Sequence, residues 1–208
     1  PAAASPQPEL HPPLIGRAGA REQLRAAAGK LALIEGDAGV GKTRLARILA
    51  QALNCLRPDA PCGDCPSCRR IESGTHPDVR VVRGEGAGDS LKIDQVRALQ
   101  REAALFPYEG RKRVLILRRM DLASTEAANS LLKTLEEPPA HAMFILATTE
   151  MHKIPATVLS RCQRHEFRRI PVADCVAHLR KQSELEKIEV ESDALTLIAR
   201  QSTGALRD

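Results

Sequence analysis

The stretch Leu31–Thr43, which reads LALIEGDAGVGKT, decides the fold predicted for this chain. It begins with a short apolar run of strand length and continues into GDAGVGKT at residues 36–43, which satisfies the pattern G-x-x-x-x-G-K-[ST]. Apolar residues at Leu45, Ile48 and Leu49 then recur with helical spacing. Glycines in such a turn let backbone N–H groups converge on an anion, and the N-terminus of the helix adds positive potential. The sequence therefore predicts a phosphate-binding loop between a strand and a helix, in preference to a chance glycine-rich turn.

The predicted loop gives its polar side chains defined tasks. Lys42 is expected to reach the β- and γ-phosphates of a nucleoside triphosphate, and the Thr43 hydroxyl is expected to hold Mg²⁺. The residues expected to bind ATP or ADP here are Gly36, Gly39, Val40, Gly41, Lys42, Thr43 and Arg44.

Hydrolysis of the nucleotide depends on the end of a neighbouring strand. In sites of this class an acidic residue at that position holds Mg²⁺, and a second carboxylate often activates water. The candidate strand, residues 114–117, is followed by Arg118 and Arg119, and a guanidinium neither binds a metal cation nor accepts a proton near neutral pH. Asp121 lies beyond the strand end and is poorly placed to substitute. We expect nucleotide binding with Mg²⁺ held weakly and with little hydrolysis, unless the acid lies on another strand.

Strand-like and helical segments alternate after residue 30. Besides the first strand, the predicted strands lie at residues 79–82, 114–117, 143–148 and 162–167. Alternation with amphipathic helices implies right-handed βαβ units, and therefore an α/β fold with a parallel sheet and helices on both faces. After Ile170-Pro171 only helical patterns follow. We predict a flexible leader at residues 1–13, an α/β domain at 14–170, and the beginning of a small helical domain at 171–208.

Four of the six cysteines have the spacing C-x6-C-x2-C-x2-C, which is typical of a metal site. Four thiolates would complete the tetrahedral coordination of zinc and leave no position for water, so the metal would be structural. Disulfides are the competing interpretation, but the phosphate loop indicates the reducing cytoplasm. Cys162 and Cys175 stand apart and are expected to be buried apolar thiols. The predicted zinc module at residues 55–68 has the ligands Cys55, Cys62, Cys65 and Cys68.

The composition excludes some classes of function. The 208 residues include 2% aromatic residues, which argues against recognition of bases by aromatic stacking. The formal net charge of +5 permits contact with phosphate backbones without requiring it. No apolar run approaches the roughly 18 residues that a membrane span needs, and the leader lacks the apolar core of a signal peptide. We expect a cytoplasmic protein without membrane contact.

Three stretches carry a resemblance to a known family. They are the phosphate loop followed by four cysteines, STEAANSLLKTLEEPP at residues 124–139, and the segment from LATTE at 146–150 to SRC at 160–162. Together they resemble the AAA+ subunits of the bacterial DNA polymerase III clamp loader, gamma/tau and delta-prime, over residues 14–208. Gamma/tau proteins normally carry Asp-Glu where this chain has Arg118-Arg119, and His76-Pro77-Asp78 also favours delta-prime. The intact phosphate loop and residues 153–159 are closer to gamma/tau.

The resemblance implies roles for residues that their spacing alone does not single out. Arg161 matches the arginine finger, which acts on nucleotide bound by the adjacent subunit. Thr149 matches the polar residue that senses the γ-phosphate, with Thr148 as a near alternative. Arg207 matches the lid-domain arginine that reaches back to the nucleotide. Without the resemblance, each would be taken for a solvated polar side chain at the end of an element.

The main hypothesis is a delta-prime-like clamp-loader subunit that binds nucleotide, hydrolyses it poorly and donates Arg161 to a gamma/tau site. Its expected partners are the gamma/tau and delta subunits, the sliding clamp, and the backbone phosphates of primed DNA. The alternative is a catalytically active gamma/tau-like ATPase. A stand-alone zinc-bearing nucleic-acid module and a nucleotide kinase are weaker rivals, and a kinase leaves LLKTLEEPP unexplained.

Overall fold

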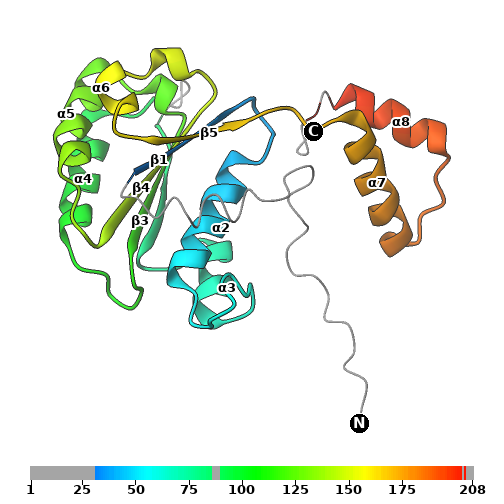
Figure 1. Cartoon of the computed structure of the whole chain (residues 1–208), viewed down its shortest axis with the longest axis horizontal. Coiled ribbons are helices and arrows are strands. Elements are labelled where there is room, and N and C mark those ends of the chain that lie inside the picture. The colour runs from blue at the N-terminus through cyan, green and yellow to red at the C-terminus, as the bar shows by residue number, and fades with distance from the viewer. Residues whose placement is uncertain (1–30, 86–89, 203, 205–208) are drawn as a thin grey trace, which may run out of the picture.

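The computed structural model describes residues 31–85, 90–202 and 204, and its centre is a five-stranded sheet (Figure 1). The strands are β1 (Leu31–Gly36), β2 (Val79–Val82), β3 (Arg113–Arg118), β4 (Ala142–Thr148) and β5 (Gln163–Phe167). Their spatial order is β2-β3-β4-β1-β5, and each neighbouring pair is parallel. Every residue of β4 is buried, as expected of a strand covered on both faces. The predicted parallel α/β sheet is confirmed.

Helices cover both faces of this sheet, also as predicted (Figure 1). The helices are α2 (Lys42–Asn54), α3 (Pro66–Ser73), α4 (Ile93–Ala104), α5 (Thr125–Glu136), α6 (Ala156–Leu159), α7 (Val172–Glu186) and α8 (Ser192–Gln201), with short 3₁₀ turns η1 (Met120–Leu122) and η2 (Met151–Lys153). Alternate side chains of each strand point to opposite faces. Leu33 and Phe144 accordingly pack with α4 and α5, whereas Ile34 and Ile145 pack with α2.

The ends of α5 follow from its sequence. The Ser124 side chain caps the helix by accepting a hydrogen bond from the backbone N–H of Ala127 at 3.2 Å. The helix stops at Glu136, two residues before Pro138, because a proline cannot continue it. Between these ends its buried face includes Leu131 and Leu135.

Two helices follow β5, as expected for the C-terminal part of the chain. α7 and α8 pack against each other around Ile170, Cys175 and Ala199. The leader predicted at residues 1–13 lies outside the described residues. Within the described ranges, no helix has the length and apolar character of a membrane span.

In this topology the carboxyl ends of β1, β3 and β4 lie at one edge of the sheet. Ligands of open α/β sheets bind outside this edge, near the strand where the chain order reverses. The segments that leave these three strands are the phosphate loop, Arg119 with η1, and residues 149–150. The fold therefore brings together three segments that are far apart in the sequence.

Candidate functional site

The three segments enclose a cavity of about 830 Å³. Among the described residues, its wall is formed by residues of the loop at 37–44, by Arg118 and Arg119 at the end of β3, and by residues 147–150 at the end of β4. The predicted phosphate loop and the predicted sensor position thus face one space. Gly36 and Val40 do not line it, and Val40 is buried in the core against α2.

The backbone of the loop explains the glycines at its start and at its end. A Cβ on Gly36 would lie 2.5 Å from the backbone oxygen of Phe167 in the neighbouring strand β5. Gly41 has a φ of 94°, in the left-handed region, and it is the residue from which α2 begins. The Lys42 ammonium donates to the carbonyl oxygens of Gly36 at 2.5 Å and Asp37 at 2.6 Å. The loop therefore curves around the Lys42 ammonium group, which is predicted to bind phosphate.

The end of β3 carries guanidinium groups on the cavity wall. The strand runs one residue further than predicted, so that Arg118 is its last residue and lies opposite Ala147 of β4. Arg119 follows in a left-handed conformation, with φ 51° and ψ 51°, and both arginines line the cavity. The place where an acidic metal ligand was sought is thus positively charged.

Asp121 has a role that the sequence did not indicate. Its buried carboxylate accepts hydrogen bonds from the Thr148 hydroxyl at 2.9 Å, the Thr149 N–H at 3.2 Å and the Thr149 hydroxyl at 3.4 Å. Burial opposes the charged form, but these hydrogen bonds and the nearby Arg119 lower the pKa of Asp121 below its usual value. The carboxylate fixes both candidate sensor threonines. The sequence does show an acid just after one strand and two threonines at and after the end of another. These residues become informative only when β3 and β4 are known to be neighbours.

The two acidic residues on the cavity wall are both ion-paired. Asp37 lies 2.7 Å from Nε of Arg169, which is the main cause of its lowered pKa. Glu150 lies 2.9 Å from Nζ of Lys153 and 3.3 Å from Nε2 of His152. Magnesium prefers carboxylate and other oxygen ligands. Both pairs are exposed, so little free energy holds these acids away from a metal. The misfit lies at the end of β3, where Arg118 and Arg119 stand in place of the acid that would hold magnesium.

Arg161 does not belong to the wall of this cavity. It follows α6, which packs beside α5, and its Nη1 donates to the carbonyl oxygen of Thr157 at 2.5 Å. Its Nη2 lies 3.2 Å from a carboxylate oxygen of Glu136. A role in trans for Arg161 therefore stays a prediction. Arg207 lies outside the described residues.

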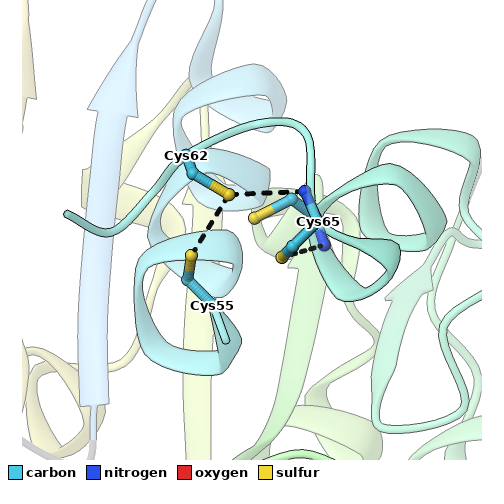
Figure 2. Close-up of side chains that lie close together, drawn as sticks. Cys55, Cys62 and Cys65 are labelled. Atoms are coloured by element: carbon cyan, nitrogen blue, oxygen red, sulfur yellow. Dashed lines mark hydrogen bonds between the residues drawn. The ribbon is translucent and has the colours of Figure 1, made fainter. Parts of the chain in front are cut away.

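The four cysteines of the predicted zinc module converge in space. Figure 2 shows three of them, Cys55, Cys62 and Cys65, with their side chains close together. Their sulfur atoms all lie within 4.8 Å of one another, and all six cysteines of the chain are free thiols. Tetrahedral zinc with sulfur ligands at 2.3 Å separates the sulfurs by about 3.8 Å, which this cluster can accommodate. Backbone N–H groups of Arg57, Cys65 and Cys68 donate to the sulfurs of Cys55, Cys62 and Cys65, respectively. The donor set fits structural zinc.

The acidity of the thiols differs within the cluster. Burial disfavours the Cys65 thiolate, but N–H groups of Leu56 and Cys68 and the neighbouring thiols lower the pKa of Cys65 to about 6. Burial raises the pKa of Cys68. Outside the cluster, burial raises the pKa of Cys162 to about 11 and also raises that of Cys175. Within the part of the chain that the structure describes, this cluster is the one place where four thiols converge.

The cysteine cluster is joined to the phosphate loop through α2. Cys55 directly follows this helix, and Cys65 caps α3, a helix that the turn-rich sequence did not predict. The buried Gln51 side chain donates to the carbonyl oxygen of Cys68 at 3.0 Å, and the Asn54 side chain exchanges hydrogen bonds with the backbone of Lys112. One rigid helix thus spans from the loop to the cluster.

Comparison with known proteins identifies the family. A family model described as "DNA polymerase III, delta subunit" matches residues 21–171. The chain belongs to this family. The DNA polymerase III tau subunit of Bacillus subtilis strain 168 is 40% identical over 178 residues, which cover 85% of this chain and 31% of that protein. The tau subunit of Escherichia coli strain K12 is 39% identical over 178 residues, or 85% of this chain and 27% of that protein.

Solved structures bear on the fold. The RuvB Holliday junction branch migration motor of Thermotoga maritima superimposes with a TM-score of 0.64 at 19% identity, covering 93% of this chain and 59% of that one. A DNA polymerase III gamma subunit-related protein of the same organism gives 0.55 at 21% identity, covering 90% and 57%. The AAA+ type of α/β fold is thereby confirmed.

These comparisons bear out the predicted family of the chain but do not bear out the predicted subunit. A clamp-loader AAA+ subunit is confirmed at the level of the family. The curated relatives with about 40% identity carry tau names, so the preference for delta-prime over gamma/tau is not confirmed. The chain spans less than a third of these two relatives.

Proposed function

We propose that this chain is the nucleotide-binding region of a gamma/tau-like clamp-loader subunit, which takes part in loading the sliding clamp onto primed DNA. The observation that carries the proposal is the phosphate loop with Lys42 inside its curve, at the carboxyl edge of a parallel sheet. Backbone N–H groups and the N-terminus of α2 favour an anion at this place. The similarity to tau subunits supports the cellular context.

In this proposal each part of the site has a physical task. The loop and Lys42 hold the phosphates, and Thr149, whose position Asp121 fixes, contacts the γ-phosphate from the end of β4. Arg161 lies apart from the cavity and acts on nucleotide held by a neighbouring subunit, where a guanidinium stabilises charge on the transferring phosphoryl group. Zinc in the cysteine cluster keeps the far end of α2 in place.

A second candidate is a delta-prime-like subunit that binds nucleotide without turning it over. It is favoured by Arg118 and Arg119 on the cavity wall, because a site of this class needs an acid there to hold the metal. The two candidates differ in hydrolysis and agree on binding and on the role of Arg161.

Nucleotide binding and turnover by the purified protein and by its reconstituted clamp loader test the proposal. Lys42→Ala is expected to abolish binding of a fluorescent ATP analogue, whereas Arg97→Gln, an exposed change on α4, leaves it unaltered. Turnover by the protein alone supports the gamma/tau-like candidate, and binding without turnover supports the delta-prime-like one. In the complex, Arg161→Ala should lower turnover at the neighbouring site by on the order of 10³-fold. Equal binding by wild type and Lys42→Ala would refute the nucleotide site.

A further inference from the structure

The cavity wall carries more positive than negative charge. Among the described residues, four cationic ones line it, Lys42, Arg44, Arg118 and Arg119, against the acidic Asp37 and Glu150. Cations outside the wall already pair with both carboxylates: Arg169 with Asp37, and Lys153 with Glu150. Arg44 has a long ion pair of 3.5 Å with Glu72. The balance of charge therefore favours a strongly anionic ligand.

The two arginines after β3 occupy the place of the usual metal ligands. Arg118 ends the strand opposite Ala147, which also lines the cavity, so the end of β3 is a part of the wall. Arg119 holds a left-handed backbone conformation that residues with side chains adopt rarely, and conformations of this kind cluster at functional sites. Asp121, the next acid along the chain, already accepts hydrogen bonds from Thr148 and Thr149.

We propose that this pocket binds a nucleoside triphosphate in its metal-free form, with Arg118 and Arg119 supplying the positive charge that Mg²⁺ supplies in other phosphate-loop sites. The inference rests on the nucleotide binding that both candidates of the proposed function share, because it specifies the form of nucleotide that the same pocket takes. It favours the candidate without turnover, since phosphoryl transfer at a site of this class depends on the metal ion. A guanidinium is permanently charged and can bind two phosphate oxygens through parallel N–H donors. A magnesium ion on the β- and γ-phosphates removes two negative charges from the ligand and brings a dication towards two guanidiniums.

Mg²⁺ should therefore weaken the binding of ATP to this pocket, whereas it strengthens binding at an ordinary phosphate-loop site. The protein should bind ATP in EDTA more tightly than in excess Mg²⁺, by about tenfold. Replacement of both arginines by glutamine should weaken metal-free binding by a similar factor and leave binding of the Mg²⁺ complex nearly unchanged. Replacement of both by lysine, which keeps the charge, should retain the preference for metal-free ATP.

Equilibrium titration of the purified protein with a fluorescent ATP analogue, in EDTA and in excess Mg²⁺, tests the inference. The variants are Arg118→Gln/Arg119→Gln, Arg118→Lys/Arg119→Lys and Arg118→Asp/Arg119→Glu, with Arg97→Gln at an exposed position of α4 as a matched control. Thermal unfolding followed by circular dichroism identifies any variant that fails to fold. The Asp/Glu variant is expected to require Mg²⁺, since it restores acids at the end of β3.

The outcomes separate this inference from the proposed function. Binding by wild type that is tighter in EDTA, and is weakened there by the Gln variant, supports the inference. Binding by wild type that requires Mg²⁺, or a Gln variant that retains full metal-free affinity, overturns it while leaving the nucleotide site intact. Absence of binding in both buffers refutes the proposed function itself.

Discussion

Replacement of Asp121 tests the link between the end of β3 and the candidate sensor on β4. The carboxylate accepts three hydrogen bonds, two of them at 2.9 and 3.2 Å and one long, at 3.4 Å. A hydrogen bond to a charged group contributes about 1.5–3 kcal/mol, and a neutral one about 0.5–1.5 kcal/mol. Asp121→Asn keeps an acceptor oxygen and loses the charge, so it should lower the free energy of unfolding by about 2 kcal/mol. Asp121→Ala removes every acceptor and should lower it by about 4 kcal/mol.

Urea unfolding of the two variants measures these losses, with Asp94→Asn at an exposed position of α4 as the control that should change stability by less than about 0.5 kcal/mol. A second measurement, the ratio of ATP to ADP affinity, reports on function. The released Thr149 should no longer discriminate the γ-phosphate, so this ratio should fall towards one. A purely structural role for Asp121 would leave the ratio unchanged in variants that remain folded.

The pH dependence gives an independent check with a defined sign. The pKa of Asp121 in the folded protein is lowered from its ordinary value of 3.8, despite burial, by the Thr148 and Thr149 hydrogen bonds and by Arg119. A carboxylate with a depressed folded pKa contributes its full stability above the unfolded pKa, and this contribution is lost as the pH falls through the folded pKa. The stability gap between wild type and Asp121→Asn should therefore be full at neutral pH and shrink in acid below about pH 4. A gap that is independent of pH, or an Asp121→Ala cost below about 1 kcal/mol, would refute the reasoning.

Two further predictions concern the cysteine module and its surroundings. Cys68→Ser should lower the zinc content measured by metal analysis and the melting temperature with it, whereas Cys162→Ser should retain zinc; full zinc in Cys68→Ser would contradict the assignment. The Asp78 carboxylate accepts hydrogen bonds from the backbone N–H groups of Tyr108, Glu109 and Gly110 at 2.6, 2.9 and 2.7 Å. Asp78→Asn offers one acceptor oxygen in place of two. It should reduce the free energy of unfolding, measured in urea, by about 3 kcal/mol. Unfolding curves that coincide with wild type would exclude this role.

Features that depend on local pattern could be predicted from the sequence. The loop at residues 36–43 combines glycine spacing with a strand before it and a helix after it, and the structure has these elements. The ends of α5 also follow local signals in the sequence, a serine that caps its first turn and Pro138 two residues after its last residue. The four cysteines are close in sequence, so that a single turn-rich segment brings them together.

Features that depend on strand order could not be predicted. Nothing in the sequence near Asp121 says that β3 pairs with β4, and without that pairing its three hydrogen bonds to Thr148 and Thr149 are invisible. α3 was missed for a different reason. Its first residue is Pro66, and a proline there looks like part of a turn although the first helical position tolerates it well.

The surroundings of Arg161 have a bearing on its proposed action in trans. The guanidinium lies 3.2 Å from Glu136, and the two side chains are 38% and 47% exposed. An exposed pair of this kind contributes about 0–1 kcal/mol, so little free energy is needed to separate it. A phosphate oxygen is a stronger partner than a solvated carboxylate, because it can be bound by two N–H donors in a site from which water is excluded. In the proposed action in trans, Glu136 would therefore be only a weak competitor for Arg161, which could leave it for a neighbouring nucleotide; a rigid, buried ion pair would prevent this.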